Sequence, residues 1–355
     1  MAETVYDMVR HWRLINTINN TDFLQPHPKN FDALLQVYLL VLKKHDVGFD
    51  WKKPLDKSKV NDRLKKNRDV PEVYYSIPNW LHQKGSGEFG NTWPEELKAL
   101  NAQAPLVIRV NTLKTTVAEI QRALEEQQIA FAPSDISANA LILEQRINIF
   151  SNDLFKNGLV EVQDEGSQLI GDFCGVKPGM RVVDACAGAG GKSMQLAALM
   201  NNKGKIISMD VEARKLDELK KRARRAGAFN IEPRLIESGK TIKKLEKSAD
   251  VVLLDVPCSG TGVLRRNPDA KWKLTLDFIE RIKQTQAHIL AEYSKMVKPG
   301  GTLVYSTCSI LSEENREQAD AFLQSTSEFE LMEEKTLTPY KNGTDGFYMA
   351  RFKRK

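Results

Sequence analysis

From residue 156 onward the chain alternates short apolar runs with amphipathic helical segments, and this alternation constrains its fold more than any other feature. The runs that read as strands are 181–184, 205–210, 251–255 and 301–305. Helical segments between them cover residues 193–200, 211–226 and 277–296. Strands separated by helices in this way pair in parallel, and helices then cover both faces of the sheet. The pattern predicts an α/β fold with a mostly parallel, Rossmann-like sheet over residues 156–355.

Two smaller regions precede this sheet. Residues 1–95 read as a helical region, interrupted by prolines. Residues 96–155 show two apolar runs, 106–111 and 140–143, around an amphipathic segment at 116–127, and predict a small α/β module similar to an RNA-recognition motif. The last apolar run, 347–352, is predicted to close the large sheet as an edge strand.

Positive charge is concentrated in one stretch of the N-terminal region. The formal net charge of the 355 residues is +6, and residues 52–68 alone hold eight basic residues against two aspartates. Such a run suits a polyanionic partner such as RNA. A solvated or unstructured face has the same composition, so charge alone leaves both interpretations open.

Cysteine usage and hydropathy indicate in which cellular compartment the protein acts. The four cysteines, at 174, 186, 258 and 308, form no CxxC pair and no metal-ligand spacing, so we expect neither a disulfide framework nor a metal site. The N-terminus lacks the pattern of a signal peptide, and no apolar run is long enough to span a bilayer. We expect a cytoplasmic, monomeric protein with no membrane association.

A glycine-rich turn follows the first strand of the large sheet. Glycines at this position let the backbone approach a ligand, and an acid at the end of the next strand can accept hydrogen bonds from a ribose. The residues concerned are Asp184, Cys186, Ala187, Gly188, Ala189, Gly190, Gly191, Lys192 and Asp210.

Three cofactor classes compete for this turn, beside a purely structural role. A P-loop requires glycine at position 186, which is cysteine, and a dinucleotide fingerprint requires glycine at 193, which is serine. S-adenosylmethionine (SAM) carries no phosphate and needs only a close backbone and a ribose acid. SAM is therefore the favoured interpretation.

Two cysteines follow buried strands and open turns. Cys258 comes after the run 251–254 and Cys308 after 302–304, so both are expected to face the crevice at the carboxyl ends of the strands. A thiolate there can add to C6 of a pyrimidine and make C5 nucleophilic. Asp255 can stabilise the charge that develops on the ring, and Lys192 can orient Asp255. For a single cysteine, a buried structural role would be the simpler interpretation.

These residues lie in motifs that resemble the RsmB/Nop (Sun) family of RNA cytosine-5 methyltransferases. The matching segments are 255–272, 305–310 with Glu314 and Asn315, 162–168 and 345–347. The resemblance covers about residues 98–355 and implies a class I methyltransferase fold with SAM as cofactor. It further implies that Cys308, after Thr307, is the attacking nucleophile and that Cys258, after Pro257, assists release of the product.

Two positions depart from the family pattern. The glycine turn lacks the family's usual proline, because Ala189 precedes Gly190 and Gly191. The acid on the adenine side of the cofactor is usually aspartate, and Glu237 is the nearest match here.

The sequence thus predicts an enzyme that forms 5-methylcytidine in structured RNA through a covalent Cys308–C6 adduct. Ribosomal RNA of the small subunit is favoured as substrate. A tRNA methyltransferase and a non-catalytic SAM-binding assembly factor for RNA are the alternatives. Candidate contacts to the RNA backbone are Arg109, Arg265, Arg266 and Lys271.

Overall fold

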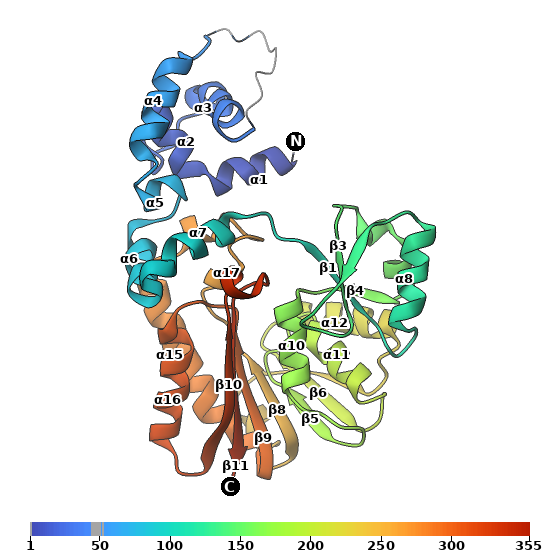
Figure 1. Cartoon of the computed structure of the whole chain (residues 1–355). Helices are drawn as coiled ribbons and strands as arrows, with labels where there is room; N and C mark the ends of the chain where they lie inside the picture. The colour runs from blue at the N-terminus through green and yellow to red at the C-terminus, as the bar shows by residue number, and fades with distance from the viewer. Residues whose placement is uncertain (1, 44–50, 52) are drawn as a thin grey trace. The chain divides into compact units, whose positions relative to one another are not determined.

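The computed structural model of the chain describes residues 2–43, 51 and 53–355 (Figure 1). Lys52, the first residue of the basic run, lies outside the described residues. The chain divides into two compact units: residues 1–103 with 264–276, and residues 104–263 with 277–355.

The first unit is helical. Its core contains Leu14, Ile18, Leu34 and Val37, which are spaced so that one face of each helix is buried. The helices are α1 (Ala2–Arg10), α2 (Trp12–Asn19), α3 (Phe31–Tyr38), α4 (Lys57–Asn67), α5 (Pro71–Tyr74), α6 (Asn79–Phe89), α7 (Trp93–Asn101) and α14 (Ala270–Lys273), with short turns η1 (Pro28–Asn30), η2 (Leu39–Lys43) and η3 (Gly90–Thr92).

Helix α14 belongs to this unit although its residues follow the Cys258 loop in the sequence. Lys271 Nζ donates to the carbonyl oxygen of Arg10 over 2.8 Å and to Asn101 Oδ1 over 3.0 Å, and Trp272 Nε1 donates to the carbonyl oxygen of Val9 over 3.0 Å. These bonds satisfy the carbonyl groups at the end of α1 that no helical partner reaches. The segment 264–276 is therefore fixed to the N-terminal helices.

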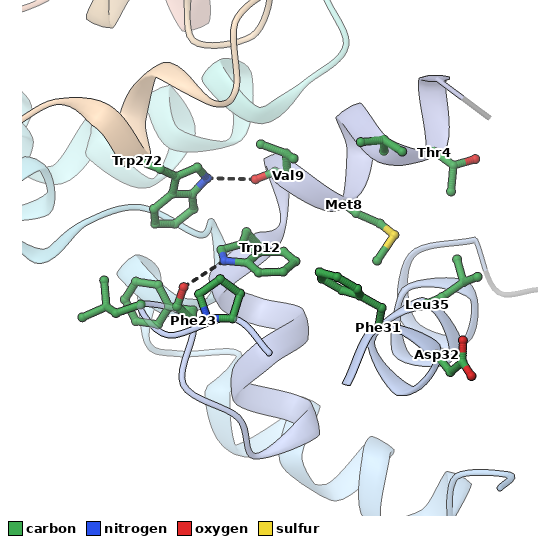
Figure 2. Close-up of a pocket in the computed structure, with 12 residues that line it drawn as sticks. Thr4, Met8, Val9, Trp12, Phe23, Phe31, Asp32, Leu35 and Trp272 are labelled. Carbon is green, nitrogen blue, oxygen red and sulfur yellow. Dashed lines mark hydrogen bonds between the residues drawn. The ribbon is translucent and has the colours of Figure 1, made fainter. Parts of the chain in front are cut away.

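An apolar cavity of about 820 Å³ lies in the same unit (Figure 2). Trp12, Phe23, Phe31 and Trp272 contribute aromatic walls. The indole N–H of Trp12 donates to the carbonyl oxygen of Phe23 over 2.9 Å, and that of Trp272 is bonded to Val9. Both indole donors are thus used within the protein, and the walls present hydrocarbon to the cavity.

The second unit begins with a four-stranded antiparallel sheet of order β2-β3-β1-β4. The amphipathic helix α8 packs on it through Ile120 and Leu124, and the capping box of Thr116 and Glu119 starts that helix. The elements of this module are β1 (Leu106–Val110), α8 (Val117–Glu126), β2 (Phe131–Pro133), β3 (Ala140–Leu143), η4 (Ile149–Ser151), α9 (Asp153–Lys156) and β4 (Val160–Val162).

A seven-stranded sheet of order β10-β11-β9-β8-β5-β6-β7 forms the rest of the unit. Strands β5 to β9 pair in parallel, and β11 pairs antiparallel with both β9 and β10. The strands are β5 (Arg181–Asp184), β6 (Lys205–Asp210), β7 (Ile231–Leu235), β8 (Ala249–Asp255), β9 (Val297–Thr307), β10 (Phe329–Leu337) and β11 (Phe347–Arg354).

Helices cover both faces of this sheet (Figure 1). Val182 packs on one face with α10–α12, and Val183 on the other with α15 and α16, which explains the unbroken apolar runs of the central strands. The helices are α10 (Glu165–Phe173), α11 (Gly191–Leu199), α12 (Ala213–Ala226), α13 (Gly239–Lys243), α15 (Leu276–Tyr293), α16 (Arg316–Ser325) and α17 (Pro339–Asn342), with η5 (Thr261–Val263), η6 (Ser294–Met296) and η7 (Ser312–Glu314).

The mostly parallel α/β fold is confirmed, with one correction. The last strand, β11, is not at the edge: it lies between β9 and β10, and Met349, Ala350 and Phe352 are fully buried. The edge is β10, which the apolar pattern did not predict because five successive residues of this strand, 332–336, are exposed and three of them are charged.

Candidate active site

The glycine turn leaves β5 and enters α11 in a conformation that requires glycine. Gly188 and Gly190 have φ angles of +54° and +84°, where other residues are strained. A Cβ at Gly190 would lie 2.6 Å from Leu219 Cγ, whereas a Cβ at Gly188 or Gly191 would meet no described atom within 4 Å. The turn is therefore tight on its inner side and open on its outer side, where a ligand can approach the backbone.

Two arginines donate hydrogen bonds to carbonyl oxygens of this turn. Arg109 Nη1 donates to the carbonyl oxygen of Gly191, and Arg222 Nη1 to that of Ala189, both over 3.1 Å. Arg222 is in turn held by Glu161, which is 2% exposed, over 2.9 Å. Arg109 is itself buried, and burial lowers its pKa to about 10. The structure argues against the RNA contact predicted for Arg109 and places it as a support of the turn.

The acid at the end of β6 is engaged with the same turn. Asp210 Oδ2 accepts a hydrogen bond from the Gly188 N–H, and Oδ1 accepts one from the Glu212 N–H, each over 2.9 Å. A carboxylate oxygen has a second lone pair, so both oxygens can still accept a hydrogen bond from a ligand hydroxyl. The geometry suits a ribose.

Asp184, at the end of β5, is buried, and one of its two carboxylate oxygens has a hydrogen-bond partner among the described residues. Its Oδ2 accepts a hydrogen bond from Ser193 Oγ over 2.6 Å, while Oδ1 has no hydrogen-bond partner among the described residues. Burial raises the pKa of Asp184 to about 6. Burial also raises the pKa of the neighbouring Cys186 thiol well above its usual value.

Lys192 and Asp255 form an ion pair across adjacent strand ends. Lys192 Nζ lies 2.6 Å from Asp255 Oδ2, and Ser306 Oγ donates to Asp255 Oδ1 over 3.0 Å. Burial opposes the charge on Lys192, but the Asp255 carboxylate outweighs it and raises the pKa of Lys192. The lysine therefore stays charged and fixes the orientation of the carboxylate.

The two cysteines meet in front of this pair. Cys258 follows β8 and Cys308 follows β9; their Sγ atoms are 3.3 Å apart, and the Cys308 N–H donates to Cys258 Sγ over 3.3 Å. Both are free thiols and half-buried. The hydrogen bond with Cys308, together with burial, raises the pKa of Cys258 well above its usual value. Cys258 therefore holds a proton beside the Cys308 sulfur.

A buried carboxylate that the sequence did not single out for a role joins the two cysteine loops. Glu314 is fully buried and accepts hydrogen bonds from the Ser259 N–H over 2.8 Å, from Ser309 Oγ over 2.6 Å and from Gln286 Nε2 over 3.0 Å. Ser259 follows Cys258 and Ser309 follows Cys308, so one side chain fixes both loops. The repeated Cys-Ser pairs were the available signal.

Four further residues were predicted to contact cofactor or RNA: Glu237, Arg265, Arg266 and Lys271. Glu237 is exposed, just after β7, and the structure shows no hydrogen bond that ties it to the glycine turn among the described contacts. In the helical unit, Arg265 is 5% exposed and Arg266 is half-buried. Lys271 is 1% exposed, and burial lowers its pKa well below the usual value. A side chain so placed cannot contact a phosphate, so the RNA contact predicted for Lys271 is corrected to a structural role.

The polar groups around the glycine turn fit SAM better than a nucleoside triphosphate. A P-loop needs its lysine free for phosphate, whereas Lys192 is paired with Asp255. Asp210, the open side of the glycine turn and the unpartnered Asp184 Oδ1 provide acceptors and space for a nucleoside, with no cation directed at a phosphate. Within the described residues, no group of three or more histidine, cysteine or acidic side chains is placed to hold a metal ion.

No helix of the described part of the chain is long and apolar enough to cross a bilayer.

Comparison with known proteins agrees with this geometry. Residues 175–353 match the family model of the 16S rRNA methyltransferases RsmB/F, and residues 77–150 match that of the ferredoxin-like domain of the same proteins. The probable ribosomal RNA small subunit methyltransferase B of Bacillus subtilis is 34% identical over 299 residues, which cover 79% of this chain and 67% of the relative.

Two solved structures share the fold. PH0851 has a TM-score of 0.82 at 27% identity, over 99% of this chain and 89% of its own. A methyltransferase homologue from Pyrococcus horikoshii has a TM-score of 0.73 at 26% identity, over 81% of this chain and 98% of its own.

Proposed function

The chain belongs to the RsmB/F family of SAM-dependent methyltransferases, and we propose that it methylates C5 of a cytidine in ribosomal RNA of the small subunit. The observation that carries the proposal is the cluster of Cys258, Cys308, Asp255 and Lys192 beside the glycine turn. The rRNA substrate is supported by the name of the Bacillus subtilis relative, which describes a small-subunit rRNA methyltransferase.

The first chemical step is assigned to Cys308. Its sulfur, as a thiolate, adds to C6 of the cytosine and pushes electron density to C5. The Cys258 thiol, 3.3 Å away, can donate a hydrogen bond to that sulfur and so stabilise its negative charge before attack. When bound, SAM supplies an electrophilic methyl group to C5.

Asp255 and Lys192 are assigned to the N3 edge of the ring. Addition at C6 places negative charge on the ring, and a proton donor at N3 lowers the energy of that state. Charged Lys192 donates a hydrogen bond to Asp255 Oδ2 and is the source of that proton, and Ser306 fixes the other carboxylate oxygen. The pair is thus already oriented when the base enters, which reduces reorganisation during the reaction.

Cys258 is assigned to release. After methyl transfer the C5 proton must leave so that the C6–S bond can break and Cys308 can depart as thiolate. The hydrogen bond with the Cys308 thiol is the largest cause of the raised pKa of Cys258. That bond raises the pKa because Cys258 donates its proton to the Cys308 sulfur. Once Cys308 is bonded to carbon as a thioether, its sulfur accepts this hydrogen bond more weakly, so Cys258 becomes easier to ionise at the step that requires a base.

The sequence predicts three regions, 1–95, 96–155 and 156–355, with different tasks. We propose that the first two parts bind RNA and that the third holds cofactor and catalytic residues. We expect the enzyme to act in the cytoplasm as a monomer. Sedimentation of the purified protein with and without RNA tests the oligomeric state.

Transfer of labelled methyl groups from SAM tests the function. Small-subunit rRNA and tRNA are offered separately, and the labelled nucleoside is identified after digestion. We expect 5-methylcytidine in rRNA, and loss of label in Cys308→Ala. Label in tRNA alone would favour the tRNA enzyme. Absence of label from every RNA, including RNA prepared from cells lacking the protein, would favour a non-catalytic assembly factor.

A further inference from the structure

The N-terminal helical unit contains a second cavity, separate from the apolar one and different in chemistry. Its volume is about 980 Å³, and residues of α4, α5 and α7 line it. Asn61, Lys65 and Arg68 come from α4 and its C-terminal end, Tyr74 and Tyr75 from α5 and the residue after it, and Lys98 from α7. We call this cavity the tyrosine pocket.

Three cations on the tyrosine pocket have no acidic partner among the described contacts. Lys65, Arg68 and Lys98 are exposed and make no ion pair, although Lys59 on the same helix pairs with Asp56. Glu95 is the one acid among the described residues that line the pocket. Cations that are not neutralised within the protein are available to an anion, and phosphate is the anion that a chain of this family meets.

The aromatic wall adds a second feature that phosphate alone does not require. The rings of Tyr74 and Tyr75 have centroids 5.2 Å apart and planes at 88°, and both are half-buried. Because the rings are perpendicular, one can offer its face to a planar ligand while the other supports it edge-on. The exposed amide of Asn61 lies on the same pocket and can both donate to and accept from the edge of a base.

The apolar cavity of Figure 2 lacks this combination. Its lining residues include Asp32 and neither lysine nor arginine, and its aromatic side chains already use their indole donors internally. Aromatic walls therefore occur in both of these cavities, but of the two only the tyrosine pocket is lined by cations without an ion pair among the described contacts.

We propose that the tyrosine pocket binds one unpaired nucleotide of an RNA strand. The base stacks on Tyr74 or Tyr75, and Lys65, Arg68 and Lys98 hold the adjacent phosphates. Proteins that hold single strands combine these two elements, a stacking surface and a positive groove. The choice of RNA as ligand rests on the proposed function, whereas the site itself lies within the helical unit and takes no part in methyl transfer.

Binding of a short, fluorescently labelled single-stranded RNA to the full-length protein tests the proposal. A matched strand without bases serves as the second ligand, and anisotropy is measured over a range of salt concentrations. The charge variant replaces Lys65, Arg68 and Lys98 with alanine. Its control replaces three exposed lysines elsewhere, Lys177, Lys203 and Lys295, and so removes the same charge.

We expect the charge variant to lower the magnitude of the salt slope by about 2, which corresponds to three lost phosphate contacts on a single strand, and the control to leave the slope near that of the unchanged protein. Equal slopes in the two variants would overturn the proposal, because net charge rather than the pocket would then determine binding.

The stacking variants are Tyr74→Leu and Tyr75→Leu, with the exposed Tyr6→Leu as control. We expect the unchanged protein to prefer the strand with bases, and at least one folded stacking variant to lose about 5- to 100-fold in affinity for that strand while retaining its affinity for the strand without bases. Equal affinity of the unchanged protein for the two strands would overturn the proposal. Since every readout is binding, a failure of methyl transfer leaves the test unaffected.

Discussion

Lys192 Nζ donates a hydrogen bond of 2.6 Å to Asp255 Oδ2 and thereby joins the helix after the glycine turn to the strand that precedes Cys258. The pair connects the cofactor side of the site with the side of the thiols. Its two residues are 63 positions apart in the sequence, and only the parallel pairing of β5 with β8 brings them together.

Lys192→Met should reduce methyl transfer by about 100-fold or more, because Asp255 loses both its orientation and the proton shared with the lysine. SAM binding, measured by calorimetry, should change much less than turnover. Lys295→Met, at an exposed lysine paired with Glu292, is the control and should leave turnover unchanged. Normal turnover in Lys192→Met would remove the pair from the mechanism.

Glu314→Ala should lower the free energy of unfolding by several kcal/mol. The substitution leaves the Ser259 N–H, Ser309 Oγ and Gln286 Nε2 without their acceptor in a buried place, and each such loss costs about 1–3 kcal/mol. Thermal unfolding measures the change. Glu317→Ala, at an exposed residue of α16, should alter the melting temperature little. Similar melting temperatures for the two variants would show that Glu314 does not fix the cysteine loops.

Asp184 should make stability depend on pH in the acid range. Its pKa is raised from 3.8 to about 6, so between these values the folded state binds more protons than the unfolded state. Stability should therefore fall as pH rises from about 4 to 6, by about 3 kcal/mol for a shift of this size.

Asp184→Asn keeps an acceptor for Ser193 and cannot ionise, so this part of the pH dependence should be absent. Denaturant unfolding of both proteins at pH 4.5 and pH 7 measures the difference. The exposed Asp217→Asn should retain the pH dependence of the unchanged protein. Parallel pH profiles for Asp184→Asn and the unchanged protein would contradict a raised pKa at this carboxyl.

The sequence predicted the elements whose pattern is local. The turn from β5 into α11 was visible because its glycines and the acid at 210 occupy fixed positions relative to two apolar strands. The approach of Cys258 to Cys308 also followed, since strands that pair in parallel end at one edge of the sheet.

The features that were missed depend on tertiary contacts. β10 has an exposed, charged surface, so it carries no apolar alternation, and its absence from the prediction placed β11 wrongly at the edge. Lysine side chains are usually exposed, and nothing in the local sequence marks Lys271 as different. It can be buried because the carbonyl oxygen of Arg10 and the amide oxygen of Asn101, both distant in sequence, accept hydrogen bonds from it. Glu314 lies in a recognised motif, yet two of its partners, the Ser259 N–H and the Gln286 side chain, come from the loop after Cys258 and from α15, which are distant in sequence.

The central claim is that Cys308 bonds covalently to the RNA base and that Cys258 is needed to break that bond. Cys258→Ala, Cys308→Ala and the double variant are incubated with small-subunit rRNA and SAM and then separated under denaturing conditions. We predict that Cys258→Ala retains a protein–RNA adduct and that both variants lacking Cys308 retain none. An adduct in the double variant, or normal turnover by Cys258→Ala without an adduct, would contradict the account.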